Sequence, residues 1–479
     1  MSPIVHWFRR DLRIADNTAL SAAARDGDGA LGVFVLDDHY GDDQGIGSPR
    51  FRFLRESLEE LERNLAGAGG RLVVRRGPAA EALPRLLSET GADAVYANAE
   101  VGPWPEERDG KVSAALESAG ARFRLFPDAL LVEPDALFSG SGEPYTTYSP
   151  FARAWDAVEK RPPGAAPSRF AAPAIGSVPL GRVRAWKDLP GEDGAPRGGA
   201  AEAARLLADF TSRSLAEYAR QRDFPALDAT SRLSPHLHFG TISPRTVLAA
   251  VEEARRAAPH VPGASKFVRE LAWREFFHHV LFHFARVARE SFQRPMDALP
   301  WGHDPASLAA WREGRTGYPF VDAGMRQLAA THWMHNRARM TTASFLTKDL
   351  HAHWREGERW FELQLADADL ASNNGGWQWV AGTGADAAPF FRIFNPVLQS
   401  KKFDADGAYI RRWVPELARV PAGRIHEPWT MTADEQKAAG CRIGTDYPAP
   451  IVDHAKERAA ALAGYERLRK GAAAATGLQ

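Results

Sequence analysis

Residues 367–396, DADLASNNGGWQWVAGTGADAAPFFRIFNP, contain the pattern that decides the fold of the second half of the chain. Asp369, Asn373 and Trp377 recur at every fourth position, so in a helix they lie along one face. A carboxylate, an amide and an indole on one stripe suit a flat aromatic ligand with polar edges better than an apolar core. Trp379 lies roughly 200° round the helix from Trp377, so the two indoles point in opposite directions. A glycine-broken buried helix with core tryptophans is an equally good interpretation of the spacing alone.

Helical periodicity continues on both sides of this stretch, from residue 201 to the end of the chain, and strand signals are nearly absent there. Ser243 and Pro244 are typical of an N-cap and a first helical residue. The pattern therefore predicts an all-α domain over residues 201–479, with helices expected at 244–257, 265–290, 304–312, 319–330, 336–348, 356–367 and around 377, and a few short helices after 409.

The first third of the chain has a different period. Short β-rich runs alternate with amphipathic helical segments, of which 48–65 is the clearest; the runs are 4–8, 31–36, 71–75, 94–98 and 123–126. This alternation predicts a doubly wound, parallel, five-stranded Rossmann-like sheet over residues 1–132. Ligands of such sheets bind at the carboxyl ends of strands, here the loops 9–13, 37–47 and 98–107. No GxGxxG motif follows the first run, so a dinucleotide in this sheet is disfavoured.

Residues 133–200 are rich in proline, glycine and serine, and only 150–158 has a helical pattern. So long an irregular segment is unusual inside one domain, so it is expected to be a linker running over the surface between the two domains.

Composition describes an ordinary globular protein, with 44% hydrophobic and 25% charged residues. The single cysteine, Cys441, excludes an internal disulfide and a four-cysteine metal or iron–sulfur site, and it favours the cytoplasm. Formal net charge is +0, so any nucleic-acid binding has to come from a local basic patch.

Five stretches closely resemble the DNA photolyase/cryptochrome family, and they follow one another along most of residues 215–405. They are TSRLSPHLHFG (230–240), ELAWREFF (270–277), WMHNRARM (333–340), NNGGWQW (373–379) and TGADAAPFFRIFNP (383–396). The resemblance is closest to bacterial class I cyclobutane pyrimidine dimer photolyases. It implies flavin adenine dinucleotide (FAD), light and DNA containing pyrimidine dimers.

Consecutive hydroxyls, amides and a guanidinium at 230–234 suit a diphosphate, although serine-rich turns also cap helices. Arg339 and Asp367 are expected to form a buried ion pair beside the flavin, with the Asn373 amide near its N5 edge. Altogether the resemblance assigns FAD contacts to Tyr218, Thr230, Ser231, Arg232, Leu233, Ser234, Phe267, Arg274, Arg339, Asp367, Asp369 and Asn373.

For catalysis, the resemblance implies that Glu270, Asn336 and Met340 contact the damaged bases while Trp273 and Trp379 clamp the dimer. The (6-4)-photoproduct enzymes place histidines for proton transfer at two of these positions, which are Asn336 and Met340 here. Since reversal of a cyclobutane dimer needs electron transfer and no acid catalyst, the substitutions favour that substrate.

Trp301, Trp354 and Trp377 match the family's electron relay to photoexcited oxidised flavin, although Trp311, Trp333 and Trp360 are present too. The DNA-facing set implied by the resemblance is Arg222, Glu270, Trp273, Arg274, Asn336, Arg337, Arg392, Gln399 and Lys401, with Lys402 beside it. Each cation alone is equally typical of a solvated surface.

The resemblance also implies a light-harvesting antenna in the first domain, either a folate or a deazaflavin. Folate-binding members carry an Asn-Glu pair where this chain has Trp104 and Pro105, ahead of Arg108 and Asp109, and this departure favours deazaflavin over methenyltetrahydrofolate. The arginines of RRDLR at 9–13 are either antenna ligands or a solvated loop. His278, His279 and His283 have helical spacing for a metal, but a third ligand is not evident, so no metal site is expected.

The sequence therefore predicts a monomeric, cytoplasmic photolyase that acts on ultraviolet-damaged DNA. A blue-light-sensing cryptochrome that signals through a protein partner is the alternative, and the Asn at 373 argues against it. A dark flavin oxidoreductase would need a nicotinamide-binding motif, which we do not find.

Overall fold

The structure, a computed structural model, describes residues 2–36, 49–180, 194–257, 262–389 and 392–476. It divides into two compact units, which are described separately below. The first comprises Met1–Leu189, Pro196–Ala219 and Thr230–Ala285, and the second comprises Pro190–Ala195, Arg220–Ala229 and Arg286–Gln479. Within the described ranges, no helix has both the length and the apolar character needed to cross a bilayer.

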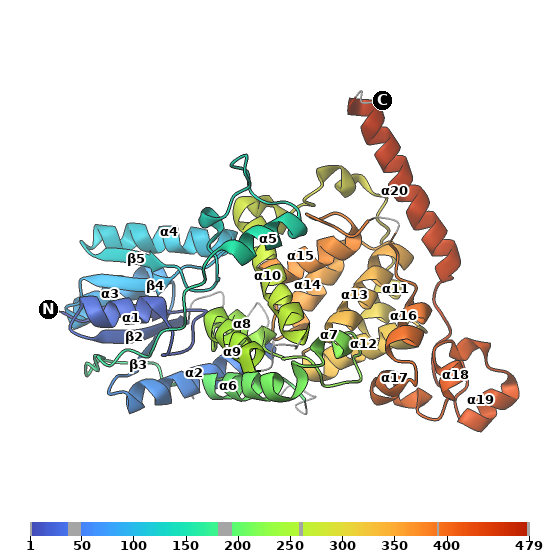
Figure 1. The fold of residues 1–479 in the computed structure, drawn as a ribbon, viewed down its shortest axis with the longest axis horizontal. Helices are drawn as coiled ribbons and strands as arrows, with labels where there is room; N and C mark the ends of the chain where they lie inside the picture. The colour runs from blue at the N-terminus through green and yellow to red at the C-terminus, as the bar shows by residue number, and fades with distance from the viewer. Residues whose placement is uncertain (1, 37–48, 181–193, 258–261, 390–391, 477–479) are drawn as a thin grey trace. The chain divides into compact units, whose positions relative to one another are not determined.

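The first unit contains the predicted parallel sheet, in the order β3-β2-β1-β4-β5 (Figure 1). Its strands are β1 (Ile4–Phe8), β2 (Ala30–Leu36), β3 (Leu72–Arg76), β4 (Ala94–Asn98) and β5 (Arg122–Phe126). Ile4 pairs with Ala30 of β2, and Val5 pairs with Val95 of β4. The strand order reverses between β1 and β4, so the crevice where ligands of open sheets bind lies beyond their carboxyl ends.

Successive side chains along the strands point to opposite faces of the sheet. Apolar side chains occupy both faces, so both are buried. Helices α1 (Thr18–Asp26) and α2 (Pro49–Gly67) cover one face together with Phe8 and Phe34. Helices α3 (Ala79–Thr90) and α4 (Pro103–Ser118) cover the other. The α2 stripe predicted from the sequence is buried in full: Phe51, Leu54, Leu58, Leu61 and Leu65.

Residues 133–180 of the predicted linker pack closely within the first unit. Their main chain bonds to the sheet through Ala30 N to Arg169 O (3.1 Å) and Val178 N to Val74 O (3.0 Å). They also include α5 (Tyr148–Ala157), which lies beside α10 (Pro262–His283) in Figure 1. The remaining helices of this unit are α6 (Ala200–Asp209), α8 (Ser234–Phe239) and α9 (Pro244–Ala257), and the short α7 (Tyr218–Gln221) spans a boundary between the units.

The described part of the second unit is helical, as predicted. Its helices are α11 (Pro305–Arg312), α12 (Pro319–Thr331), α13 (Asn336–Ser344), α14 (Trp354–Gln364), α15 (Leu370–Ala381), α16 (Pro396–Phe403), α17 (Ala408–Trp413), α18 (Ala422–Ile425), α19 (Ala433–Ala439) and α20 (His454–Thr476). One large apolar cluster, built around Trp311, Phe345 and Trp377, packs α11 to α15 together.

Three helix predictions were wrong at their ends. The helix expected over 265–290 ends at His283 and is followed by a 3-10 helix at Ala285–Ala288. The helix expected over 336–348 ends at Ser344 and continues as a π-helix at Phe345–Asp349, in which Lys348 is buried. The helix expected over 356–367 is α14, which begins earlier because the His353 side chain caps it by accepting from Arg355 N.

Candidate functional site

In the RRDLR segment at the end of β1, every residue except the half-buried Arg10 is buried, so its interpretation as a solvated loop was wrong. Arg9, Asp11 and Arg13 are 3%, 3% and 5% exposed. Arg9 donates two hydrogen bonds to Asp109 (2.6 and 2.8 Å), and Arg13 donates to Asp128 (2.5 Å). These ion pairs offset the desolvation cost of burying the charges. They also join the end of β1 to α4 and to the chain after β5.

Arg108 of α4 completes this network. Its guanidinium lies 4.9 Å from the centre of the Trp7 ring and 4.7 Å from that of Trp104, and it donates to Glu100 (2.7 Å). Burial alone would raise the pKa of Glu100, but the guanidinium groups of Arg108, Arg9 and Arg10 hold it at about 2. The carboxyl ends of β1 and β4 therefore carry a fixed pattern of charges. The loop 37–47, also expected at this edge, lies outside the described residues.

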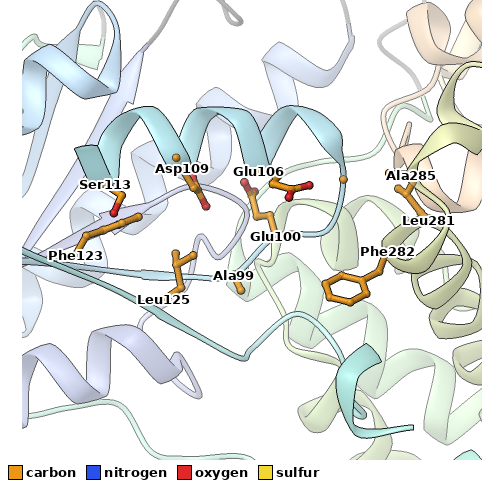
Figure 2. A pocket seen from close by; sticks show the side chains of 12 residues that line it. Ala99, Glu100, Glu106, Asp109, Ser113, Phe123, Leu125, Leu281, Phe282 and Ala285 are labelled. Atoms are coloured by element: carbon orange, nitrogen blue, oxygen red, sulfur yellow. The ribbon is translucent and has the colours of Figure 1, made fainter. Parts of the chain in front are cut away.

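A cavity of about 640 Å³ lies beside this network, entirely within the first unit. Figure 2 shows Glu106 and Asp109 of α4 on one side, Phe123 and Leu125 of β5 on another, and Phe282 of α10 at one end. The complete lining is Ala99, Glu100, Gly102, Glu106, Asp109, Gly110, Ser113, Phe123, Leu125, Leu281, Phe282 and Ala285. Apolar walls with a few carboxylates are typical of a site for an organic ring. The sequence predicted the loop 98–107 here but not the contribution of α10.

In the middle of α10, the predicted residues divide into buried and half-buried ones. Phe267 is 5% exposed and packs against Phe210 (ring centres 4.7 Å apart) and Tyr218 (5.4 Å). Glu270, Trp273 and Arg274 are half-buried. Arg274 donates to Ala129 O (3.1 Å), and Trp273 stacks on Tyr148 of α5. Sequence reasoning missed Tyr148, because it assigned the whole segment to a linker.

Glu275 ties α10 to residues between 131 and 155. Its carboxylate accepts hydrogen bonds from Leu131 N, Val132 N (3.1 Å) and Trp155 Nε1 (2.6 Å). Burial raises the pKa of Glu275 even though these donors oppose the shift. The histidines that follow also bond to main-chain carbonyls: His278 to Arg274, His279 to Val132 and His283 to Pro134. In the described ranges, no three metal-ligating side chains gather at one point.

The predicted diphosphate turn at 230–234 leads into α8, whose first residue is Ser234. Arg232 has φ 51°, which is uncommon for a residue with a side chain and costs conformational energy. The Ser231 hydroxyl accepts from Leu233 N (3.4 Å), and Leu233 is buried while Ser234 is exposed. Hydroxyls, main-chain amides and the Arg232 guanidinium on one short turn suit an anionic ligand.

In the second unit, the predicted ion pair is present. Arg339 of α13 donates to both oxygens of Asp367 (3.1 and 2.8 Å) and to Met334 O. Asp369 caps α15 by accepting from Ser372 N (2.9 Å), so it precedes the helix in which it was predicted to lie. Asn373 donates to Glu358 O (3.0 Å), which fixes its amide plane.

The two indoles of α15 lie in different surroundings. Trp377 is 3% exposed and packs against Phe361 (5.0 Å between ring centres) and Trp311 (6.1 Å). Trp379 is half-buried, and the Arg392 guanidinium lies 6.0 Å from its ring centre. This difference agrees with the opposite directions expected from the spacing. Of the other predicted relay members, Trp301 contacts His353 (5.0 Å), which in turn contacts Trp354 (5.6 Å).

Several members of the predicted DNA-facing set lie together in the second unit. Arg337 donates to Asp223 (2.8 Å) and Gln399 (3.5 Å), and its guanidinium lies over Phe403. Arg222 lies 3.9 Å from Asp223, and Lys401 pairs with Glu427. Asn336 and Arg392 are exposed, and Met340 accepts a weak hydrogen bond from Asn336 (3.7 Å). Lys402 is also exposed, with its ammonium 5.1 Å from the Phe403 ring centre.

His335, which precedes Asn336, was not singled out by sequence reasoning. It is 2% exposed, and its Nδ1 accepts from Arg337 N (3.1 Å) to cap α13. Its Nε2 is buried and has no hydrogen-bond partner among the described residues. Burial lowers the pKa of His335 to about 4, so the ring is neutral at pH 7. The motif WMHNRARM was the available signal, but a single histidine in it does not distinguish a cap from a ligand.

Two family descriptions match the chain, one over each part. Residues 4–169 match the family described as DNA photolyase, and residues 267–467 match the FAD binding domain of DNA photolyase. A deoxyribodipyrimidine photo-lyase from Agrobacterium fabrum is 43% identical over 479 residues, covering 98% of both chains. The relative from Escherichia coli with the same name is 39% identical over 483 residues, covering 97% of this chain and 98% of its own. The chain belongs to the DNA photolyase/cryptochrome family.

Solved structures of photolyases and a cryptochrome are similar to this chain, in agreement with the family. A class III photolyase from Agrobacterium tumefaciens superposes with a TM-score of 0.91 at 44% identity, covering 98% of both chains. A photolyase from Sulfolobus tokodaii, described as holding two FAD molecules with the implication of a novel light-harvesting cofactor, has a TM-score of 0.83 at 34% identity over 97% of this chain and 99% of its own. A Synechocystis cryptochrome has a TM-score of 0.87 at 30% identity over 96% and 99%. The predicted subclass, class I, stays a prediction, since a class III enzyme is among the matches.

Proposed function

We propose that this chain is a deoxyribodipyrimidine photolyase, which uses light to split cyclobutane pyrimidine dimers in DNA. The observation that carries the proposal is the full-length similarity to curated deoxyribodipyrimidine photo-lyases, at 43% identity over 98% of the chain. The fold does not separate repair from signalling, because a cryptochrome also superposes on it. Asn336, Met340 and Asn373 favour repair of cyclobutane dimers over the alternatives.

The chemistry of the predicted FAD contacts fits the cofactor. The strained turn at Arg232 offers hydroxyls, amides and a guanidinium to a diphosphate, and the Arg339–Asp367 pair offers both charges to a polar ring edge. The Asn373 amide is held by Glu358 O, so its orientation is set before a ligand binds. When bound in reduced form, FAD supplies the electron that light transfers to the dimer.

For the substrate, we assign the half-buried residues of α10 to the dimer. The Glu270 carboxyl would bond to the polar edge of a pyrimidine, and the Trp273 ring would stack on its face. Asn336 and Met340 would contact the bases, and the Trp379 ring would also stack on the dimer. Arg222, Arg274, Arg337, Arg392, Gln399 and Lys401 would hold phosphates without reading sequence. Damage is then selected by flipping the weakly stacked lesion out of the duplex.

A second chromophore is proposed for the first unit, and a deazaflavin fits its cavity better than a folate. Glu100, Glu106 and Asp109 would accept hydrogen bonds from ring N–H and hydroxyl groups, and Trp104 and Pro105 stand where folate-binding members carry an Asn-Glu pair. The volume of about 640 Å³ is in the range of organic-ligand sites. We also propose that the protein is monomeric and, given its single cysteine, cytoplasmic.

The test compares dimer loss in light and in darkness. The purified protein is reduced without oxygen and mixed with an oligonucleotide that contains one thymine dimer, and the remaining dimer is measured by chromatography. We expect repair only in light, and we expect Glu270→Ala and Trp273→Ala to weaken dimer binding by about 10-fold, since one base stack contributes about 1–3 kcal/mol. Light-independent loss, or no loss by a protein whose FAD is photoreducible, would overturn the proposal. The second result would point to the cryptochrome alternative.

A further inference from the structure

A ring stack to which no role has been assigned joins α5 to the middle of α10. The rings of Tyr148 and Trp273 are stacked, with centres 3.6 Å apart and planes 6° from parallel. Tyr148 is 7% exposed, whereas Trp273 is half-buried. Both residues belong to the first unit, although α5 lies in the segment whose sequence predicts a passive linker.

Tyr148 is itself held from several directions. Its hydroxyl donates to Arg269 O (2.9 Å), one turn before Trp273 on α10, and the edge of Phe276 meets its ring (5.9 Å, 79°). Further along α5, Phe151 packs on Phe276 (5.3 Å), and Trp155 donates to the buried Glu275. Helix α5 is therefore anchored to the far side of α10, and the phenol ring cannot slide along the indole.

The stack decides which face of Trp273 a base can use. Two parallel rings cannot share one face of an indole, so a base that stacks on Trp273 has to lie on the face opposite Tyr148. A flat ring at van der Waals distance also holds the indole in one rotamer before any ligand arrives. Without it, binding would have to immobilise Trp273, which lowers affinity.

We propose that Tyr148 is a positioning residue for the pyrimidine dimer, which acts by holding the plane of Trp273. The segment between the two predicted domains thus supplies the back wall of the dimer contact. This inference rests on the proposed function, because it takes Trp273 to be the residue that stacks on the dimer.

The test uses three variants of the full-length protein. Tyr148→Ala removes the ring, Tyr148→Phe keeps the ring without its hydroxyl, and Tyr145→Ala is the matched control. Tyr145 lies on the same segment and contacts Phe151 (6.2 Å) rather than Trp273. Dark affinity is measured by fluorescence anisotropy for oligonucleotides with and without a thymine dimer, and repair per bound dimer is measured in saturating substrate.

We expect Tyr148→Ala to weaken dimer binding by about 3- to 10-fold, the effect of immobilising one side chain, with undamaged DNA bound as before. Repair per bound dimer should stay at the wild-type value, and Tyr148→Phe and Tyr145→Ala should both bind as the wild type does. The thermal midpoint is measured for every variant, and Tyr148→Leu, which keeps volume without a flat ring, replaces the alanine variant if that protein does not fold.

Equal affinity of wild type and Tyr148→Ala for the dimer would overturn the inference, as would an equal loss of affinity for damaged and undamaged DNA. These results are separable from failure of the proposed function. If the wild type repairs no dimer in light, the proposed function fails; if it repairs and Tyr148→Ala binds normally, only the role of Tyr148 fails.

Discussion

Helix α10 carries Trp273 and helix α15 carries Trp377, and different kinds of neighbour hold the two indoles. Trp273 is half-buried and has one parallel ring, Tyr148, which comes from a segment far away in the sequence. Trp377 is 3% exposed and is enclosed by core side chains of its own unit. An indole that meets a substrate needs an open face and a backing, whereas an indole that only passes an electron can be part of the core.

Both helices are also fixed by a buried glutamate, but the glutamates have different partners. Glu275 of α10 accepts two main-chain N–H groups and an indole N–H. Glu358 of α14 accepts from the Asn374 amide (2.7 Å), and its own carbonyl accepts from Asn373. The first ties α10 to residues 131–155, and the second orients two side chains of the NNGGWQW motif. The next three predictions separate these roles.

The largest effect is expected for Trp377→Phe, because phenylalanine is much harder to oxidise than tryptophan. We expect light-driven reduction of the oxidised cofactor to be lost, while enzyme that is first reduced chemically still repairs dimers. Absorbance during illumination measures the first property, and the dimer assay measures the second. Trp429→Phe, at a partly buried indole of the same unit that is not a relay candidate, is the control and should photoreduce normally. Normal photoreduction by Trp377→Phe would show that electrons do not pass through this residue.

A smaller, pH-dependent effect is expected for Glu358→Gln. Burial raises the pKa of Glu358 from 4.5 to about 7, so the folded protein binds this proton more tightly than the unfolded chain does. Its contribution therefore becomes less favourable as pH rises from about 4.5 to about 7, and it is constant above that. Because glutamine stays uncharged, the variant should gain stability over wild type across this window, by about 3 kcal/mol at pH 8.

Urea denaturation at pH 4.5 and pH 8 measures this difference. Gln keeps an oxygen for the Asn374 amide, so the hydrogen bond is retained. The same stability difference between variant and wild type at both pH values would contradict the raised pKa.

The smallest effect is expected for Gly357→Ala, which tests how tightly Trp377 is enclosed. An added Cβ at Gly357 would lie 2.0 Å from the Trp377 ring, so the indole or α14 has to shift. We expect destabilisation by about 2 kcal/mol, typical of overpacking, in thermal or urea unfolding. Gly67→Ala, at the exposed end of α2 with open space around its Cβ, is the matched control and should not destabilise. Equal stability of both variants would mean that the core around Trp377 is loose.

Much of the fold was predictable, because the periodicity of apolar residues in the sequence indicates strands and amphipathic helices. β1 and β4 begin and end at the predicted residues, and the α2 stripe is buried as expected. Helix ends were less predictable, since they depend on caps and packing: His353 extends α14, and the chain at 345–349 changes to a π-helix where Lys348 is buried.

Contacts in the candidate site were predictable only where both interacting residues lie in recognisable stretches of sequence. The Arg339–Asp367 pair was expected, because both residues lie in recognisable motifs. The stack of Tyr148 on Trp273 and the contribution of Phe282 to the cavity were not, since they join segments with no pattern in common. RRDLR was misjudged for a related reason: its carboxylate partners Asp109 and Asp128 lie about a hundred residues away.

Helix α10 also fixes the distance between two sites of the first unit. Its residue Phe282 lines the acidic cavity, and Trp273, nine residues earlier on the same helix, lies at the proposed dimer contact. Nine residues of α-helix span about 14 Å, and a helix anchored along its length cannot shorten or lengthen. The efficiency of resonance energy transfer falls with the sixth power of distance. This fixed spacing would hold any chromophore in the cavity at a short and constant distance from the proposed dimer contact.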